Sequence, residues 1–395
     1  MIAKTVSRDG SYFASPGLES AHLDYEDASG RVVPHSLTRA LAISTEVVKS
    51  RSVRIPFQLP VSSVRWRVVI RNINYRTNTV YRGKVTLHSV SVGEGVRSMN
   101  GRPSAIFVSP DEADSVQYTP ARDVVVDDLG DGWASEWQGG KLSSGVDYLL
   151  SYGYTTEGQE VQRNIGSGWQ ALGTPERAMR VQDGHVKYTR RQPFDVRIEY
   201  ATSAPTDLVV GDSIATGSNA MFPIHEAPLA IANRTLNRAT RNHAFGGAGL
   251  SEWGGPHWAD PDSFKWRDVT DYGFADRVFL ALGNNDVHAG ASLETLQNRF
   301  SSLTQLVRDR ISQSLVVCTV TPRAAWVGTA KEDVRNAFND WLRTFPDGVG
   351  AIAETAYLVE DSSRSAPRRD YNVGDGIHFN SNGSAAMASA IITAR

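Results

Sequence analysis

The stretch LVVGDSI, residues 208–214, decides the fold of the second half of the chain. Its first three residues make a short apolar run, which is typical of a strand buried in a parallel sheet. Gly211 follows directly and allows a sharp turn, so that Ser213 would stand at the end of the strand. Gly-Asp-Ser is also common in ordinary turns, and the stretch alone therefore does not distinguish a reactive serine from a simple turn.

Segments downstream of this stretch alternate between strand and helix patterns. Two more short apolar runs, RVFLAL (277–282) and LVVCTV (315–320), predict buried strands. Between them apolar residues recur at steps of three and four, which predicts a helix over about 292–312 with Ser292 near its start. Two further helices are predicted, over about 331–344 and 383–393. This alternation indicates a mostly parallel sheet with helices on both faces, where reactive groups gather at the carboxyl ends of the strands.

The first half of the chain has the period-two pattern of β-strands. Apolar and polar residues alternate in several segments rich in Val, Ile and Tyr, and Gly, Pro, Asn and Asp separate these segments. The segments are 52–59, 63–73, 83–92, 147–155 and 194–201. In the last of them Val196, Ile198 and Tyr200 fall on one face. Many short strands without a long helix predict an all-β sandwich that resembles a jelly roll.

The two patterns meet at TSAPTD (202–207), where Pro205 disfavours continuation of a strand. We therefore divide the chain into a β-sandwich accessory domain, residues 1–203, and an α/β domain, residues 204–395. A length of 395 residues agrees with two domains.

The bulk composition is that of an ordinary globular protein, with 41% hydrophobic and 21% charged residues. A net charge of -2 gives no argument for binding nucleic acid, and no apolar run is long enough to span a membrane. The N-terminus lacks the pattern of a secretory signal, so we expect a soluble protein that is cytoplasmic as synthesised, with a virion-associated or released protein as the alternative. The one cysteine, Cys318, lies in an apolar run and is expected to be a small buried residue.

A second candidate element is DGIH, residues 375–378. A serine hydroxyl is a poor nucleophile until a base removes its proton, and imidazole is suited to that near neutral pH. The imidazole needs an acceptor for its other nitrogen, and Asp375 could supply it to His378 from the same loop. A surface turn or half of a metal site is the alternative interpretation.

Two further elements offer neutral hydrogen-bond donors. In GNND (283–286), just after a predicted strand, the Asn285 amide could stabilise negative charge on a carbonyl oxygen. The alternative is a turn capped by an Asn side chain. In NHAFGGAG (242–249), Gly247 would let a backbone N–H approach a ligand closely, since glycine has no Cβ.

Taken together and in this order, GDSI, the Asn242–Gly247 segment, GNND and DGIH resemble the four sequence blocks of the SGNH (GDSL) hydrolases. Asp276-Arg277, Thr321-Pro322-Arg323 and the segment VRNAFNDWLR are also similar to that family. The resemblance covers about 205–395 and leaves the first half unassigned.

The resemblance implies a three-layer α/β/α fold of flavodoxin-like topology that uses neither metal nor cofactor. Ser213 would be the nucleophile, His378 the base and later the acid, and Asp375 the residue that orients the imidazole. The oxyanion hole would consist of the Ser213 N–H, the Gly247 N–H and the Asn285 amide. The chain departs from the family pattern at Ile214, where the family has Leu. Gly246 and Gly247 are adjacent, so the glycine that donates its N–H could be either of the two.

Three residues near these blocks are weaker candidates for substrate contact: Trp253, Trp258 and His288. Flat aromatic faces beside the serine would stack on a sugar ring or line an acyl groove. The alternatives are that the two Trp anchor their loop to the domain and that His288 is a residue of the rim.

These features predict a serine esterase with an acyl-enzyme mechanism, acting on O-acetyl or other short acyl groups of a carbohydrate. The partner would be a small-molecule or polysaccharide ester; the oligomeric state stays open. The alternatives are a lipase, thioesterase or acyltransferase of the same fold, or a phage tail or cell-surface receptor-binding protein with an esterase-like domain.

Overall fold

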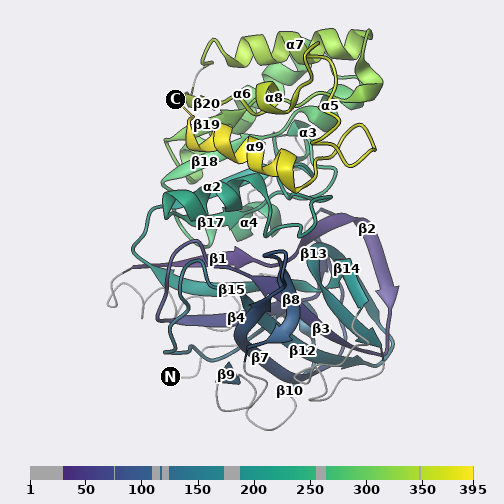
Figure 1. Cartoon of the computed structure of the whole chain (residues 1–395), viewed down its shortest axis with the longest axis vertical. Helices are drawn as coiled ribbons and strands as arrows, with labels where there is room; N and C mark the ends of the chain where they lie inside the picture. Colours follow the sequence, from purple (N-terminus) through teal and green to yellow (C-terminus); the bar gives the residue numbers. More distant parts are fainter. Residues whose placement is uncertain are drawn as a thin grey trace. The chain divides into compact units, whose positions relative to one another are not determined.

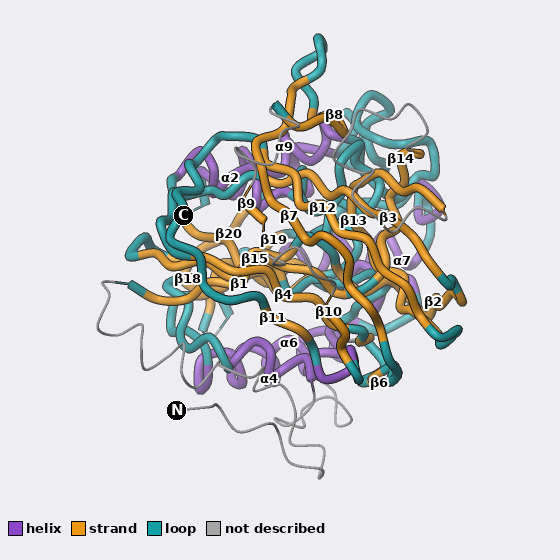
Figure 2. Tube along the Cα trace, turned by 90° about the horizontal axis from the view of Figure 1, so that it is seen from below, coloured by secondary structure: helices purple, strands orange, loops and turns teal. Residues whose placement is uncertain are grey.

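The computed structural model describes residues 30–74, 76–108, 116–117, 124–172, 187–254, 264–346 and 348–394. The chain divides into two compact units, Met1–Ala204 and Pro205–Arg395. Each unit is described by itself below, and Figures 1 and 2 show that strands dominate the first unit whereas the labelled helices belong to the second.

The described strands of the first unit form two main antiparallel sheets. One has the order β1-β15-β4-β11; the main path of the other is β10-β7-β12-β3-β13-β14, with β2, β8 and β9 paired at its sides. The strands are β1 (Arg31–Ser36), β2 (Arg39–Val47), β3 (Ser50–Phe57), β4 (Trp66–Arg71), β5 (Ile73–Asn74), β6 (Thr79–Val80), β7 (Val85–Arg97), β8 (Pro103–Phe107), β9 (Val116–Gln117), β10 (Val124–Val126), β11 (Trp133–Ala134), β12 (Tyr148–Thr156), β13 (Glu160–Leu172), β14 (Lys187–Pro193) and β15 (Asp195–Thr202). This arrangement confirms the predicted all-β region.

Strand β15 illustrates how the first unit is packed. Val196, Ile198 and Tyr200 are fully buried, as their shared face predicts. The polar residues between them are buried as well: the Glu199 carboxylate lies 2.7 Å from the Arg67 Nε and 3.2 Å from the Arg197 Nη2. The alternating pattern therefore marks two buried faces, one apolar and one held by paired charges, because a buried carboxylate is tolerated only with partners.

The second unit has a five-stranded parallel sheet with the order β17-β16-β18-β19-β20. The strands are β16 (Thr206–Gly211), β17 (Ala239–Asn242), β18 (Arg277–Ala281), β19 (Leu315–Cys318) and β20 (Val349–Ala353). In chain order this is 2-1-3-4-5, the flavodoxin-like order, with a topological switch point between β16 and β18. The predicted fold of this domain is confirmed.

Helices cover both faces of this sheet. They are α2 (Pro228–Leu236), α3 (Leu250–Gly254), α4 (Phe264–Thr270), α5 (Asn284–His288), α6 (Leu293–Arg310), α7 (Ala330–Leu342), α8 (Thr355–Val359) and α9 (Ser381–Ile392). Figure 1 shows α2 and α9 side by side on one face, and these helices contact each other. Their residues Leu229 and Ile391 join Val209, Phe279 and Val316 of the strands in one apolar core. In the other layer α6 contacts both α3 and α7.

The structure also bears on three expectations from the sequence, which concern a cap for α6, the burial of Cys318 and membrane-spanning segments. Ser292 caps α6, since its hydroxyl accepts a hydrogen bond from the Thr295 N–H at 3.2 Å. Cys318 is buried in β19, and burial raises the pKa of its thiol to about 12. Within the described residues, the helices are too short or too polar to cross a bilayer.

Candidate active site

Ser213 stands in a tight turn that follows β16 directly. The Asp212 carboxylate accepts the Ile214 N–H at 2.8 Å, and the Asp212 carbonyl accepts the Thr216 N–H at 3.1 Å. A Cβ at Gly211 would lie 2.5 Å from the Cβ of Ala215, so the strand turns this sharply only with glycine there. The turn presents Ser213 at the carboxyl end of β16, where the strand order reverses.

The structure brings the serine, the imidazole and the carboxylate into one hydrogen-bonded chain. The Ser213 Oγ lies 2.9 Å from the His378 Nε2, although the two residues are 165 positions apart. The His378 Nδ1 lies 2.7 Å from the Asp375 Oδ2. The order hydroxyl, imidazole, carboxylate can move a proton from the oxygen to the nitrogen while the carboxylate stabilises the imidazolium.

The DGIH loop is held from several sides. Asn372 Nδ2 donates to the His378 carbonyl at 2.8 Å, and the Ala324 N–H donates to the Gly376 carbonyl at 2.9 Å. Gly376 has a φ of 71°, and a Cβ there would lie 2.8 Å from the Ala324 Cβ. These contacts keep the imidazole in place without a regular helix or strand.

The Asp375 carboxylate is kept ionised by its own loop. Burial raises its pKa, but the backbone N–H of His378, the imidazole and the Ile377 N–H all donate to the carboxylate, and the net effect holds the pKa below its usual value. The backbone bonds reach the Asp375 Oδ1 at 2.8 Å from His378 and 2.9 Å from Ile377. The carboxylate is therefore charged throughout the pH range in which a histidine titrates.

Asn285 lies in the first turn of α5, and Gly247 lies in the loop between β17 and α3; a hydrogen bond joins the two segments. The Asn285 Nδ2 donates to the Ala248 carbonyl at 2.8 Å. Gly247 has a φ of 81°, a conformation that favours glycine, and it is partly exposed whereas Gly246 is buried. The difference in exposure favours Gly247 over Gly246 as the backbone donor.

Asp286, to which the sequence assigned no role, ties α5 to the start of α3. Its carboxylate accepts the N–H groups of Leu250 at 2.7 Å and Ser251 at 3.1 Å, at the start of α3. Arg299 of α6 donates to the same carboxylate at 2.9 Å. The sequence holds no signal for this contact, because Leu250 and Ser251 lie 36 and 35 positions before Asp286 and only the fold brings them together.

The weaker candidates have different outcomes. The prediction that Trp253 contacts a substrate is wrong: its side chain is 1% exposed and packs against Phe245 and Trp266, with ring centroids 5.6 and 5.2 Å away. The ring is apolar core because α3 turns it inward. Trp258 lies outside the described residues. His288 ends α5 and is exposed, and its carbonyl accepts the Lys331 Nζ at 2.5 Å, so contact with a substrate stays a prediction.

A small cavity of about 40 Å³ lies behind the Ser213 turn. Its lining is mostly apolar and includes Asp212, Ile214, Leu229 and Ile391, but not Ser213. Burial raises the pKa of the Asp212 carboxyl to about 6, although hydrogen bonds from the turn and the nearby cations oppose the shift. Within the described residues, no cluster of three or more His, Cys, Asp and Glu side chains could hold a metal ion.

The buried Asp212 predicts a pH-dependent stability. Its folded-state pKa of about 6 lies above the ordinary carboxyl value, so the folded state binds the proton more tightly than the unfolded state does. The resulting contribution to the free energy of unfolding is complete below the ordinary carboxyl pKa and is lost as the pH rises through 6. Asp212→Asn cannot ionise and is expected to be more stable than the wild type by up to about 3 kcal/mol at pH 8.

Urea unfolding at pH 8 and pH 4.5 measures this effect. The advantage of Asp212→Asn should shrink by roughly 2 kcal/mol at the lower pH, where the wild-type carboxyl is protonated in the folded state. A difference in unfolding free energy that is the same at both pH values would contradict the raised pKa.

One family profile matches the second unit of the chain. The profile of the "GDSL-like Lipase/Acylhydrolase family" matches residues 209–386, all within the second unit. No curated protein matches the chain.

Solved structures similar to the chain include lipolytic proteins of the G-D-S-L family. The one from Desulfitobacterium hafniense is 13% identical, with 47% of this chain and 97% of that chain covered and a TM-score of 0.38. The one from Veillonella parvula is 16% identical, with 48% and 97% covered and a TM-score of 0.40.

A family two carbohydrate esterase from Clostridium thermocellum is 15% identical, with 92% of this chain and 97% of that chain covered and a TM-score of 0.38. The family assignment rests on the profile match. On that match, residues 209–386 form a domain of the GDSL-like lipase/acylhydrolase family, the esterase family that the sequence motifs predict.

Proposed function

We propose that this protein hydrolyses short-chain carboxylic esters of a carbohydrate through an acyl-enzyme, with Ser213 as the nucleophile. The observation that carries the proposal is the hydrogen-bonded chain from the Ser213 Oγ through His378 to Asp375, at 2.9 and 2.7 Å. A hydroxyl in this setting has an adjacent base, and the base has a fixed orientation, which are the two requirements for an activated serine.

In the first half of the reaction the Ser213 oxygen attacks the ester carbonyl and its proton passes to the His378 Nε2. The carbonyl oxygen becomes an oxyanion, which the Asn285 amide and the backbone N–H groups of Gly247 and Ser213 would stabilise. The tetrahedral intermediate collapses when His378 returns the proton to the leaving alcohol, and the acyl group stays on Ser213. Water then attacks the acyl carbon while His378 takes its proton, and the bond from that carbon to the Ser213 Oγ breaks as His378 returns the proton to the Ser213 Oγ, which releases the acid and restores the site.

Two features of the site favour a short acyl group on a bulky alcohol. The side chains of His378 and Asp375 are 22% and 37% exposed, so the leaving-group side is open to a large alcohol such as a sugar. The cavity behind the turn is lined by Asp212 and Ile214 but not by Ser213, so it offers no channel from the reacting carbon for a long acyl chain. A lipase or long-chain thioesterase would need such a channel.

Hydrolysis of p-nitrophenyl acetate tests the reaction class. We expect release of p-nitrophenol, complete inhibition by a serine-directed fluorophosphonate, and a phosphonate adduct on the peptide that contains Ser213. No turnover and no adduct would leave a binding role as the better interpretation. An adduct on another serine would contradict the assigned nucleophile.

Acyl-chain preference tests the substrate class. We expect kcat/KM for p-nitrophenyl esters to fall by about tenfold or more between acetyl and octanoyl, because the apolar cavity behind the turn is not lined by Ser213 and so does not receive a long acyl chain from it. Release of acetate from an acetylated polysaccharide, with the deacetylated polymer as control, then tests the carbohydrate. Equal or better hydrolysis of octanoyl esters would indicate a lipase or thioesterase instead, and transfer of the acyl group to an added sugar in place of water would indicate an acyltransferase.

A further inference from the structure

Arg323 is a buried arginine beside the Asn285 amide. It lies in the loop after β19 and is 6% exposed. Its Nη2 donates to the Asn285 Oδ1 at 2.8 Å, and its Nε donates to the Asn284 Oδ1. The guanidinium also lies 5.2 Å from the centre of the Trp326 ring. One guanidinium thus joins the side-chain oxygens of two consecutive asparagines at the start of α5.

These contacts leave only one orientation for the Asn285 amide. Arginine has donors but no acceptor, so the amide oxygen must face Arg323. On the other side the Asn285 Nδ2 faces the Ala248 carbonyl, which can only accept. Rotating the amide by 180° would set the NH₂ against the guanidinium and one carbonyl oxygen against another. Of the two amide hydrogens, one is bonded to Ala248 and one remains for a ligand.

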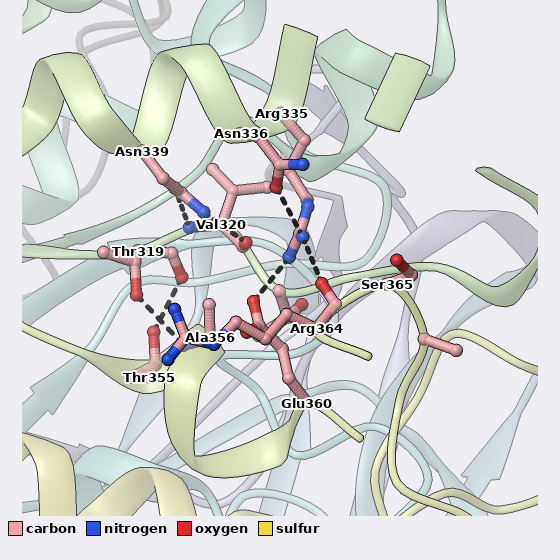
Figure 3. Close-up of polar contacts among 12 residues, drawn as sticks. Thr319, Val320, Arg335, Asn336, Asn339, Thr355, Ala356, Glu360, Arg364 and Ser365 are labelled. Carbon is pink, nitrogen blue, oxygen red and sulfur yellow. Dashed lines mark hydrogen bonds and ion pairs between the residues drawn. The ribbon is translucent and has the colours of Figure 1, made fainter. Parts of the chain in front are cut away.

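The loop that carries Arg323 is itself fixed by side-chain amides. Asn284 Nδ2 donates to the Thr321 carbonyl at 2.9 Å. On α7, Asn339 bonds both backbone groups of Val320, accepting its N–H at 2.7 Å and donating to its carbonyl at 3.0 Å. Figure 3 shows Asn339 reaching Val320 from the helix. The guanidinium therefore sits on a rigid support that runs from α7 to the site.

We propose that Arg323 is a positioning residue that orients and polarises the Asn285 amide as an oxyanion donor. The cation beside the amide oxygen draws electron density towards that oxygen and makes the remaining N–H a stronger donor. In a buried setting such a hydrogen-bond chain strengthens its members. This inference rests on the proposed function, since it assigns Arg323 a role only through Asn285.

A double-mutant cycle on turnover of p-nitrophenyl acetate separates this role from general support. Arg323→Gln is expected to lower kcat by about 10- to 100-fold with KM within about threefold, because the lost contact acts on the transition state. In the Asn285→Ala background the same substitution should lower kcat by less than about threefold, because the amide it acts through is absent. An equal loss in both backgrounds would overturn the proposal.

Two further variants serve as controls. Arg335→Gln removes an arginine that is 1% exposed and bonds to Glu360 at 2.8 Å and to the Arg364 carbonyl, as Figure 3 shows, rather than to the Asn285 amide. It should lower the melting temperature while kcat of the folded protein stays within about threefold of the wild type. Arg323→Lys keeps the charge but not the two-pronged geometry, so an intermediate kcat is expected.

If Arg323→Gln does not fold, Arg323→Lys takes its place in the cycle, and a kcat loss that persists without Asn285 would again overturn the inference.

Binding of a trifluoromethyl ketone, which forms a tetrahedral adduct with the serine, gives a second readout. Its affinity should fall with Arg323→Gln in the wild-type background and be unchanged by it in Asn285→Ala. The Ser213→Ala variant distinguishes the proposed function from the role of Arg323. Full activity in Ser213→Ala would contradict the proposed function. An inactive Ser213→Ala, together with equal effects of Arg323→Gln in both backgrounds, would contradict only the role of Arg323.

Discussion

Ser213→Ala is expected to lower kcat on p-nitrophenyl acetate by at least about 10⁴-fold while the protein unfolds at nearly the wild-type temperature. The substitution removes the oxygen that forms the acyl-enzyme, and the other groups of the site cannot replace it. Among the described residues, the Ser213 hydroxyl makes one partly buried hydrogen bond, to the His378 Nε2 at 2.9 Å, and the substitution removes it. Losing it costs about 1 kcal/mol or less. Steady-state kinetics and thermal unfolding measured on the same preparation check both halves.

Ser218→Ala is the matched control for this variant. Ser218 belongs to the same turn, and its hydroxyl lies 2.7 Å from the Thr216 Oγ1 rather than from the imidazole. It should keep kcat within about twofold, since its hydroxyl bonds to Thr216 and not to the imidazole. Activity that survives in Ser213→Ala would mean that another residue is the nucleophile. An equal loss of activity in Ser218→Ala would mean that damage to the turn, and not removal of the nucleophile, causes the loss.

Asn285→Ala is expected to lower kcat by about 10² to 10³ with a small change in KM, the loss that removal of one oxyanion donor causes. The variant also leaves the Ala248 carbonyl and the Arg323 guanidinium without their partners at 2.8 Å, so some loss of stability accompanies the kinetic effect.

Asn285→Asp tests the donor role while the Arg323 contact is kept. It keeps an acceptor for Arg323 but sets a carboxylate oxygen against the Ala248 carbonyl, and it places negative charge where the oxyanion develops, so kcat should fall at least as far as in Asn285→Ala. A kcat loss of less than about tenfold in both variants, with reduced stability, would mean that Asn285 supports the turn rather than the chemistry.

The elements with strong periodicity were predictable within a few residues. The pattern over 292–312 corresponds to α6, Leu293–Arg310, because its buried residues Leu296, Phe300 and Leu303 repeat at helical spacing. Strand β17 was not predicted: its sequence ATRN has no apolar run, yet it is fully buried. Its Arg241 is accommodated because the guanidinium donates to the carbonyls of Gly273 and Val269. A pattern of hydrophobicity cannot anticipate a buried polar residue whose partners come from elsewhere in the chain.

Aromatic residues show the same limit at the site. Trp253 and Trp258 occur in one Trp-rich segment, and the sequence could not say which faces a ligand. The structure puts Trp253 into the core against Trp266, a contact that depends on how α3 and α4 pack. Arg323 is the converse case: the block that contains it was recognised, but its bond to Asn285 required α5 and the loop after β19 to lie together.

By itself the sequence determined which residues are chemically able to act, the strands they follow and the family they resemble, because turn residues and short-range periodicity are encoded by neighbours in the chain. The tertiary structure alone decided that Ser213 and His378, 165 positions apart, meet at 2.9 Å, and that Arg323 holds the Asn285 amide. Those distances depend on the 2-1-3-4-5 order of the parallel sheet and on loops packed against each other. Such long-range contacts arise only when the whole domain has folded.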